Sequence, residues 1–232
     1  MSQRHLLLRL EAPLMAFGTT MIDAAGPVQD FPATSLLTGL IANALGWRRG
    51  DTAALQALQD RLVHAVRIDR EGERVRDYQT AKLEGADQGW TRAGAPEGRA
   101  GDAGTYKHPH PRYRWYQADA SVLVALRLEP AEEAPTLDDV ASALDRPARP
   151  LFIGRKPCLP SVPLIAGWAD GETASAAVAA GASSGDLRLF WPAGEGVVTR
   201  DRRETTGRRN WRSGVHAGRD VWFGGRVMDL AP

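Results

Sequence analysis

The sequence predicts an α+β protein with a ferredoxin-like core, and three observations lead to that fold class. Regular segments follow in the order strand, helix, strand, and again strand, helix, strand, which is the split βαβ arrangement once an insertion is set aside. The insertion runs from Lys82 to Pro111 and holds six glycines and three prolines, with almost no aliphatic residues. Beyond residue 154 we expect a small β-rich region, because short apolar runs alternate there with glycine-rich turns.

The first half of the core begins with an apolar strand. Residues 5–12, HLLLRLEA, predict a largely buried strand. An amphipathic helix is expected over residues 35–46, with Thr34 or Ser35 capping its first amides and a glycine ending it. A second helix is expected over residues 51–62, because its leucines recur at helical spacing.

The second half of the core repeats the order of strand and helix. The apolar runs at 63–69 and 119–128 predict two strands. Thr136 can cap a helix that ends near Leu144 and has aspartates in its first turn, where the helix dipole favours them. The segment PLFIG, residues 150–154, is expected to form the last strand of the core.

Shorter elements are expected in the C-terminal region. An alanine-rich segment at 172–180 predicts a short helix, and strands are expected at 186–191, 196–201 and 220–225. We therefore divide the chain into a ferredoxin-like part, residues 1–153, and a small β-rich part, residues 154–232.

Composition excludes several classes of protein. Of 232 residues, 43% are hydrophobic and 25% are charged, the balance of an ordinary globular protein. The apolar runs are too short for a membrane span, so no membrane partner is expected. One cysteine and no export signal favour a cytoplasmic location. The five histidines hold only one close pair, His108 and His110, without a zinc-binding motif, so no metal or other cofactor is expected.

Charge is distributed unevenly although the net charge is only +1. Residues 129–145 carry six acids and no Lys or Arg, whereas residues 200–219 carry seven arginines and two acids. This polarity favours a polyanion as the partner of one face. Only three of the 29 basic residues are lysine, however, and such arginine richness also arises from a GC-rich genome.

Residues 105–116, TYKHPHPRYRWY, interleave cations with aromatic residues and contain no acid. Cations of this kind hold a phosphate backbone while bases stack on the rings, so the segment is a candidate RNA contact. The alternative is a loop whose aromatic side chains pack back onto the core. Tyr, Lys and His together are also sufficient for metal-independent ribonuclease chemistry.

Residues 149–164, RPLFIGRKPCLPSVPL, place four prolines around Gly154, Arg155 and Lys156. The glycine permits close approach of two backbones, and the prolines stiffen the loop. Cys158 is interpreted as a small buried residue that braces this loop, with a nucleophilic cysteine as the alternative.

Five segments occur in the order expected of one protein family: LRLEAPLMAFG, FPATSLLTGLIANALGW, RDYQTAK, WYQADASVLVAL and RPLFIGRKPCLPSVPL. On these segments the chain resembles the Cas-five family of the RAMP superfamily, whose type I-E members are subunits of the CRISPR surveillance complex Cascade. The resemblance covers residues 4 to 165 and extends more weakly to WFGG near the end.

The resemblance implies a ferredoxin-like (RRM/RAMP) core, a β-hairpin thumb at about residues 80–116 and a small C-terminal β-sheet. It implies a non-catalytic RNA-binding subunit that holds the 5′ handle of the CRISPR RNA in antiviral defence. The implied partners are the CasC backbone filament, which the subunit caps, the large subunit CasA, and target DNA indirectly through the complex. The alternative is a metal-independent endoribonuclease that processes precursor CRISPR RNA, as in type I-C relatives.

One departure from the family pattern concerns the first helix. Relatives often have Thr-Arg-Ser-Gly where this chain has Ala33, Thr34, Ser35 and Leu36, so a cation is missing and a phosphate contact there falls to Ser35 and the helix N-terminus. The residues expected to contact RNA are Phe17, Gly18, Ser35, Lys82, Lys107, His108, Arg112, Arg114, Tyr116, Gly154, Arg155, Lys156, Arg208 and Arg209.

Overall fold

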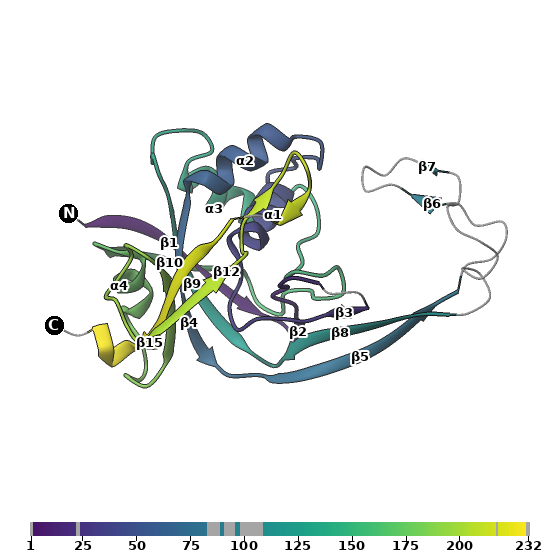
Figure 1. The fold of residues 1–232 in the computed structure, drawn as a ribbon. Coiled ribbons are helices and arrows are strands. Elements are labelled where there is room, and N and C mark those ends of the chain that lie inside the picture. The colour runs from purple at the N-terminus through teal and green to yellow at the C-terminus, as the bar shows by residue number, and fades with distance from the viewer. Residues whose placement is uncertain are drawn as a thin grey trace.

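A seven-stranded antiparallel sheet forms the body of the protein in the computed structural model, which describes residues 2–21, 24–82, 109–216 and 218–230 and two short strands at 89–90 and 96–97. The strands lie in the order β10-β1-β9-β4-β11-β15-β12 (Figure 1). Their bounds are β10 Ile165–Gly171, β1 Gln3–Glu11, β9 Ser121–Leu128, β4 Leu62–Arg70, β11 Arg188–Pro192, β15 Asp220–Arg226 and β12 Asp201–Thr205.

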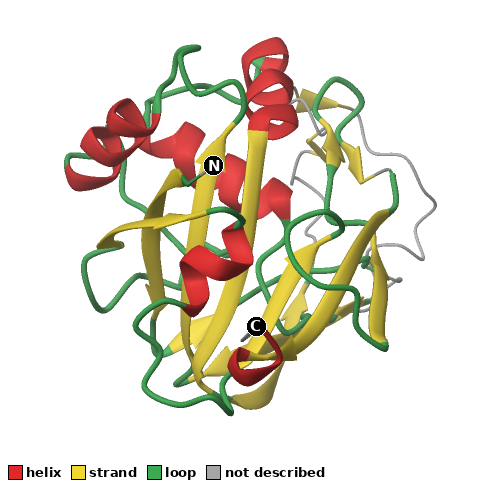
Figure 2. Cartoon of the chain, turned by 90° about the vertical axis from the view of Figure 1, so that its left-hand side faces the viewer, coloured by secondary structure: helices red, strands yellow, loops and turns green. Residues whose placement is uncertain are grey.

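Helices cover both faces of this sheet. The helices α1 (Thr34–Ala44), α2 (Thr52–Arg61) and α3 (Leu137–Asp145) pack over one face around the main core, and α4 (Ala174–Ala179) packs over the other (Figure 2). Every residue of the inner strand β9 is buried for this reason. The α+β class predicted from the sequence is therefore confirmed, with a two-sided sheet at its centre.

A second sheet contains a long hairpin that extends from the body (Figure 1). Its strands β5 (Glu73–Ala81) and β8 (His110–Ala118) pair antiparallel from Glu73↔Ala118 to Ala81↔His110. The short strand β2 (Leu14–Met15) pairs with β8 at its root, and β3 (Ala25–Gly26) pairs with the middle of β8. The short strands β6 (Gly89–Trp90) and β7 (Pro96–Glu97) pair with each other.

The local signals at the helix ends are confirmed in two cases and wrong in one. Thr136 and Asp139 form a reciprocal capping box at α3, and Gly46 has a φ of +80° after α1. Ala33, however, is the N-cap of α1, and no side chain caps that helix. The backbone amide of Ser35 instead donates to the carbonyl oxygen of Gly207.

Two predicted strands are absent where the sequence placed them. Residues 151–154 form an irregular segment that bends at Ile153, and the strand that completes this part of the sheet is β10, which was not predicted. Residues 196–200 are also irregular: β12 begins only at Asp201, and Val198 is 81% exposed. The predicted helix at 172–180 and strands at 186–191 and 220–225 correspond to α4, β11 and β15.

Candidate nucleic-acid groove

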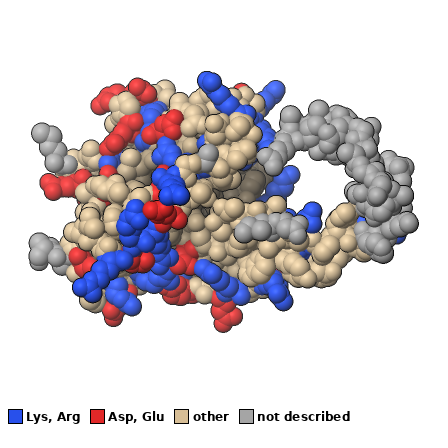
Figure 3. All heavy atoms as spheres, viewed as in Figure 1, with Lys and Arg blue, Asp and Glu red and all other residues tan. Residues whose placement is uncertain are grey.

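A groove of about 1070 Å³ opens between α1, the loop that contains Gly154 and the small hairpin of β13 (Arg209–Asn210) and β14 (Val215–His216). Among the described residues that line it there is no Asp or Glu. Lys and Arg side chains are visible along the edge of the body that faces the long hairpin (Figure 3). The basic residues of the lining are Arg48, Arg49, Arg149, Arg155, Arg209, Arg212 and His216.

Small and aromatic residues complete the lining of the groove. Glycines and alanines of α1 and its neighbours keep the floor open, and Trp47, Phe152 and Trp211 add flat apolar surface. The Trp211 ring packs near Gly39 of α1, and a Cβ at Gly39 would lie 3.9 Å from it, at ordinary van der Waals distance. Cations together with aromatic faces are the composition that binds single-stranded nucleic acid.

The loop at Gly154 fits tightly against the segment after β1. Gly154 has a φ of +87°, and a Cβ there would overlap the carbonyl oxygen of Ala16. Two backbone hydrogen bonds hold these segments close together. Ala16 N donates to Ile153 O at 3.2 Å, and Ile153 N donates to Cys158 O at 2.7 Å. The backbone contact inferred from the sequence is therefore present, although it occurs in an irregular segment and not at a strand end.

Arg155 connects this loop to the root of the long hairpin. Its guanidinium donates to the main-chain oxygens of Trp115 at 2.8 Å and Gly26 at 3.0 Å, and lies 4.8 Å from the Tyr116 ring centroid. Lys156, the next residue, is exposed. Arg155 therefore has a structural role in addition to lining the groove.

Gln59 of α2 holds the small β13–β14 hairpin in place. This side chain is 1% exposed, and its amide nitrogen donates to Arg209 O at 2.9 Å. Its oxygen accepts from Arg209 N at 3.0 Å and from the Trp211 indole at 3.1 Å. One buried amide thus fixes the wall that carries Arg209 and Trp211.

The structure brings some of the predicted contact residues together and separates others. Gly18, Ser35, Gly154, Arg155 and Arg209 all line the groove. The residues that sequence reasoning missed there include Arg48, Arg49, Arg149, Trp211 and Arg212, although the run RRNWR at 208–212 was available as a signal.

The other predicted residues lie elsewhere. The side chain of Phe17 is fully buried in the main core, and Tyr116 is 4% exposed beneath Arg155. Arg208 is paired with Asp60 at 2.8 Å. Arg112 and Arg114 lie on β8, Lys82 is exposed just after β5, and Lys107 and His108 lie outside the described residues.

The single cysteine, Cys158, and the buried histidine His64 have structural roles. Burial raises the pKa of the Cys158 thiol, which disfavours the thiolate that a nucleophile requires. Burial lowers the pKa of His64 to about 4, and the centroid of its ring lies 4.9 Å from that of the Trp222 ring.

Within the described part of the chain, no three His, Cys, Asp or Glu side chains are grouped as a metal site. Nor is any described helix long and apolar enough to cross a membrane.

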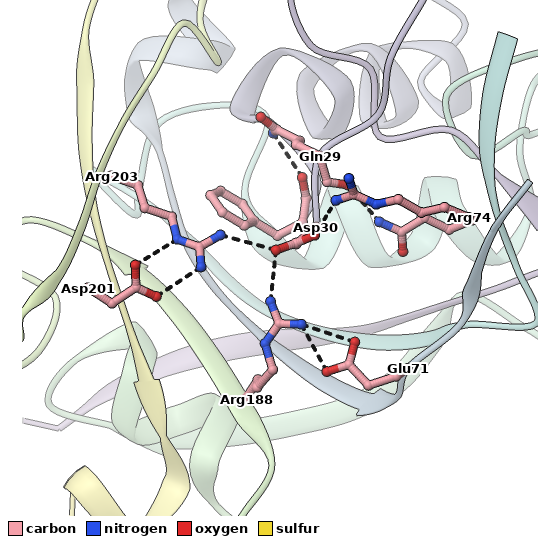
Figure 4. Close-up of polar contacts among 9 residues, drawn as sticks. Gln29, Asp30, Glu71, Arg74, Arg188, Asp201 and Arg203 are labelled. Atoms are coloured by element: carbon pink, nitrogen blue, oxygen red, sulfur yellow. Dashed lines mark hydrogen bonds and ion pairs between the residues drawn. The ribbon is translucent and has the colours of Figure 1, made fainter. Parts of the chain in front are cut away.

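A second concentration of arginines surrounds Asp30 (Figure 4). Its carboxylate accepts from Arg74 at 2.6 Å, Arg188 at 2.8 Å and Arg203 at 3.1 Å. Glu71 pairs with Arg188, and Asp201 pairs with Arg203. We call these six residues the Asp30 cluster.

The Asp30 cluster is electrically balanced, with three arginines and three carboxylates. Burial raises the pKa of Asp30, but hydrogen bonds from Arg203 and Arg188 outweigh that effect and hold the pKa below its usual range. The cluster joins the root of the long hairpin to β11 and β12. The groove, which has cations but no described carboxylate, is therefore the better site for a polyanion.

Comparison with known proteins gives consistent matches. A family model described as CRISPR-associated protein (Cas_Cas5) matches residues 5–220. Over 165 residues the chain is 33% identical to the CRISPR system Cascade subunit CasD of Escherichia coli (strain K12), and the match covers 70% of each chain.

Two solved structures are also similar. A chain of a CRISPR RNA-guided surveillance complex aligns with a TM-score of 0.61 at 21% identity, covering 96% of this chain and 89% of that one. A structure described as a Cas protein aligns with a TM-score of 0.57 at 26% identity, covering 96% of this chain and 93% of that one.

Proposed function

The chain belongs to the Cas5 family of CRISPR-associated proteins, and on this basis we propose that it is a non-catalytic RNA-binding subunit of a type I-E Cascade complex. In this role the groove beside α1 holds the 5′ handle of the CRISPR RNA. The observation that carries the proposal is the lining of the groove, which has six arginines and no carboxylate among its described residues. Such a lining attracts phosphates and releases their counterions.

The strand order supports a ferredoxin-like, RAMP-type core. In β10-β1-β9-β4 all neighbours are antiparallel, α1 and α2 connect β1 to β4, and α3 lies between β9 and β10 in sequence. This is the arrangement of a split βαβ fold. The division at residues 153 and 154 stays a prediction, and because β11 pairs with β4, the two parts share one sheet.

The long hairpin supports the proposed thumb. Its described strands, β5 and β8, extend from the body as two paired segments, as a hairpin that reaches across a bound RNA would (Figure 1). We propose that this subunit caps a CasC filament, contacts CasA and meets target DNA only through the complex. These partner roles rest on the resemblance to the family and on the similarity to CasD.

Co-expression tests the proposal. The tagged chain is produced with the CasA- and CasC-type subunits and a CRISPR array, and the RNA that co-purifies is sequenced. We expect CRISPR RNAs with one common 5′ end, and we expect the Arg48→Ala, Arg212→Ala double variant to recover less of this RNA. Both side chains are exposed and line the groove, so the fold should not change. Equal recovery of RNA by the variant would contradict the proposal.

Incubating the purified chain with precursor RNA, with and without a chelator, tests the nuclease alternative. Among the described residues that line the groove, His216 is the one histidine. Intact RNA under both conditions is the expected result. Scission that is lost in His216→Ala would favour the metal-independent endoribonuclease.

A further inference from the structure

Residues 206–216 leave the main sheet and form one wall of the groove. The strands β12 and β15 pair as far as Thr205↔Asp220, and the chain between these two residues is not part of their sheet. Within it, β13 and β14 pair with each other and form a two-stranded sheet of their own. We call residues 206–216 the flap. It carries Arg209, Trp211 and Arg212 of the groove lining.

The contacts that hold the flap against the body are mostly polar. The carbonyl oxygen of Gly207 accepts from Ser35 N at 3.0 Å. The side chain of Gln59 bonds to the flap, and Arg208 pairs with Asp60. Gly207 is the one buried residue among 206–216, so the flap places no large apolar side chain in the core. A segment held in this way belongs to the parts of a protein that open most readily.

The position of the flap leaves a buried carboxylate oxygen without a partner. Asp220, at the base of the flap, has its Oδ2 atom buried with no hydrogen bond from any described residue. Burial raises the pKa of this carboxyl group. The flap backbone lies beside this oxygen, since a Cβ at Gly207 would be 3.6 Å from it. Because an unsatisfied buried polar group is unfavourable, a movement of the flap that exposes Asp220 to water offsets part of the loss of the flap's hydrogen bonds.

We propose that the flap is a lid, which swings away from α1 and α2 to admit a single-stranded nucleic acid to the groove and then closes against it. This inference rests on the proposed function of the groove. With the lid closed, Gly207 O occupies the amide of Ser35, a residue that the sequence predicts to contact RNA. A strand that reaches this end of the groove must therefore displace the lid. Since β13 and β14 pair with each other, the lid moves as one unit and carries Trp211 and two arginines with it.

An engineered disulfide can lock the lid. A Cβ at Gly207 would lie 3.4 Å from the Ala33 Cβ, close to the separation of about 3.5–4.5 Å that is usual in disulfides. The φ of Gly207 lies outside the left-handed region, so a cysteine fits there without backbone strain. The variant Ala33→Cys, Gly207→Cys is made in a Cys158→Ala background, which removes the one native cysteine. Oxidation holds the lid closed and reduction frees it, so the reduced protein is the matched control.

Amide hydrogen exchange followed by NMR tests the lid without any RNA. The amides of Ser35, Arg209 and Trp211 each donate across the boundary between the lid and the body, to three different acceptors. One swinging motion breaks all three bonds, so in the reduced protein these amides should share one opening constant. Oxidation should slow their exchange together, by roughly ten-fold or more.

The amide of Gly214 is the internal control for this measurement. It donates to Asn210 O within the lid, so its exchange should not respond to oxidation. Three unrelated opening constants for the boundary amides, or boundary exchange that is indifferent to oxidation, overturn the lid.

Stopped-flow binding of a fluorescein-labelled oligouridine connects the lid to the groove. The reduced protein should bind as the wild type does, and the oxidised protein should associate roughly ten-fold or more slowly, because its lid cannot open. Oxidation after binding should slow release in the same way. Equal rates in both forms mean that the strand enters without movement of the lid, which overturns the proposal, while binding itself still supports the groove. Absence of binding in both forms contradicts the groove as an RNA site, whereas the exchange result still decides whether the lid opens.

Discussion

The guanidinium of Arg155 donates a 2.8 Å hydrogen bond to the main-chain oxygen of Trp115, which ties the loop after Gly154 to β8. A second bond to Gly26 O ties the same loop to β3. The arginine that the sequence singled out as a phosphate contact therefore also sets where the long hairpin leaves the body.

Truncation of Arg155 should therefore destabilise the protein, whereas truncation of Lys156 should not. Arg155→Ala leaves two main-chain oxygens without their donor, and we expect a loss of about 2–3 kcal/mol in the free energy of unfolding. Lys156→Ala is the matched control because that side chain is exposed. Urea denaturation of both variants measures the difference. Equal midpoints would show that the two hydrogen bonds do not hold the loop.

Replacement of Gly154 should be more damaging than replacement of another glycine with similar backbone geometry. Gly194 has a φ of +92° and open space around its Cβ position, so Gly194→Ala should lose about 1–2 kcal/mol through the backbone alone. Gly154→Ala adds an overlap with Ala16 O and should lose at least about 3 kcal/mol. Thermal unfolding compares the two. Similar losses would mean that the backbones can separate at little cost.

The Asp30 cluster should make stability depend on acidic pH. Because the folded-state pKa of Asp30 lies below its unfolded value of about 3.9, its contribution is present above that pH and is lost as the pH falls through the folded-state value. Asp30→Asn should therefore lose about 2–3 kcal/mol at pH 7 and approach the wild type once the pH has fallen below the folded-state pKa of Asp30. Chemical denaturation across this pH range provides the measurement. A difference between the proteins that stays constant with pH would exclude the cluster as its source.

Gln59 should control the small hairpin without contacting RNA. Gln59→Leu removes the bonds to Arg209 and Trp211 but keeps an apolar stem in a buried position. Amide hydrogen exchange at residues 209–216 should accelerate, and RNA affinity should fall because the wall of the groove is loosened. Gln56→Ala is the comparison variant, because it keeps all the Gln59 bonds and removes only one bond to the hairpin, from Trp211 N, together with the bonds from Gln56 to Asp60. It should accelerate exchange less than Gln59→Leu does. Unchanged exchange in Gln59→Leu would show that the hairpin is held by other contacts.

The apolar periodicity of the sequence was sufficient to predict the helices and strands that are buried on one or two faces. The helices α1, α2 and α3 and the strands β1, β4 and β9 have apolar residues at the spacing that their burial requires. The strand β5 is exposed along nearly its whole length, so its apolar pattern carried no signal. The edge strand β10, IAGWADG, contains two glycines and two alanines, so its apolar signal is weak. The segment at 151–154 is more apolar and predicts a strand, although the structure has none there.

The candidate site was only partly predictable for a related reason. Gly154 could be found because glycine among prolines implies an unusual backbone. The role of Gln59 could not, because its partners Arg209 and Trp211 lie about 150 residues away in the chain. Arg208 and Arg209 are adjacent in sequence, yet one pairs with Asp60 and the other lines the groove. Which arginines line the groove is decided by the tertiary fold.

The salt dependence of RNA binding tests whether the groove holds phosphates. The groove double variant Arg48→Ala, Arg212→Ala is compared with Arg202→Ala, Arg219→Ala, which removes the same charge from residues paired with Glu204 outside the groove. The account predicts that the slope of log affinity against log salt becomes shallower by about 1.4 in the groove variant, two phosphate contacts at roughly 0.7 each, and is unchanged in the control. Equal slopes for the two double variants would contradict it.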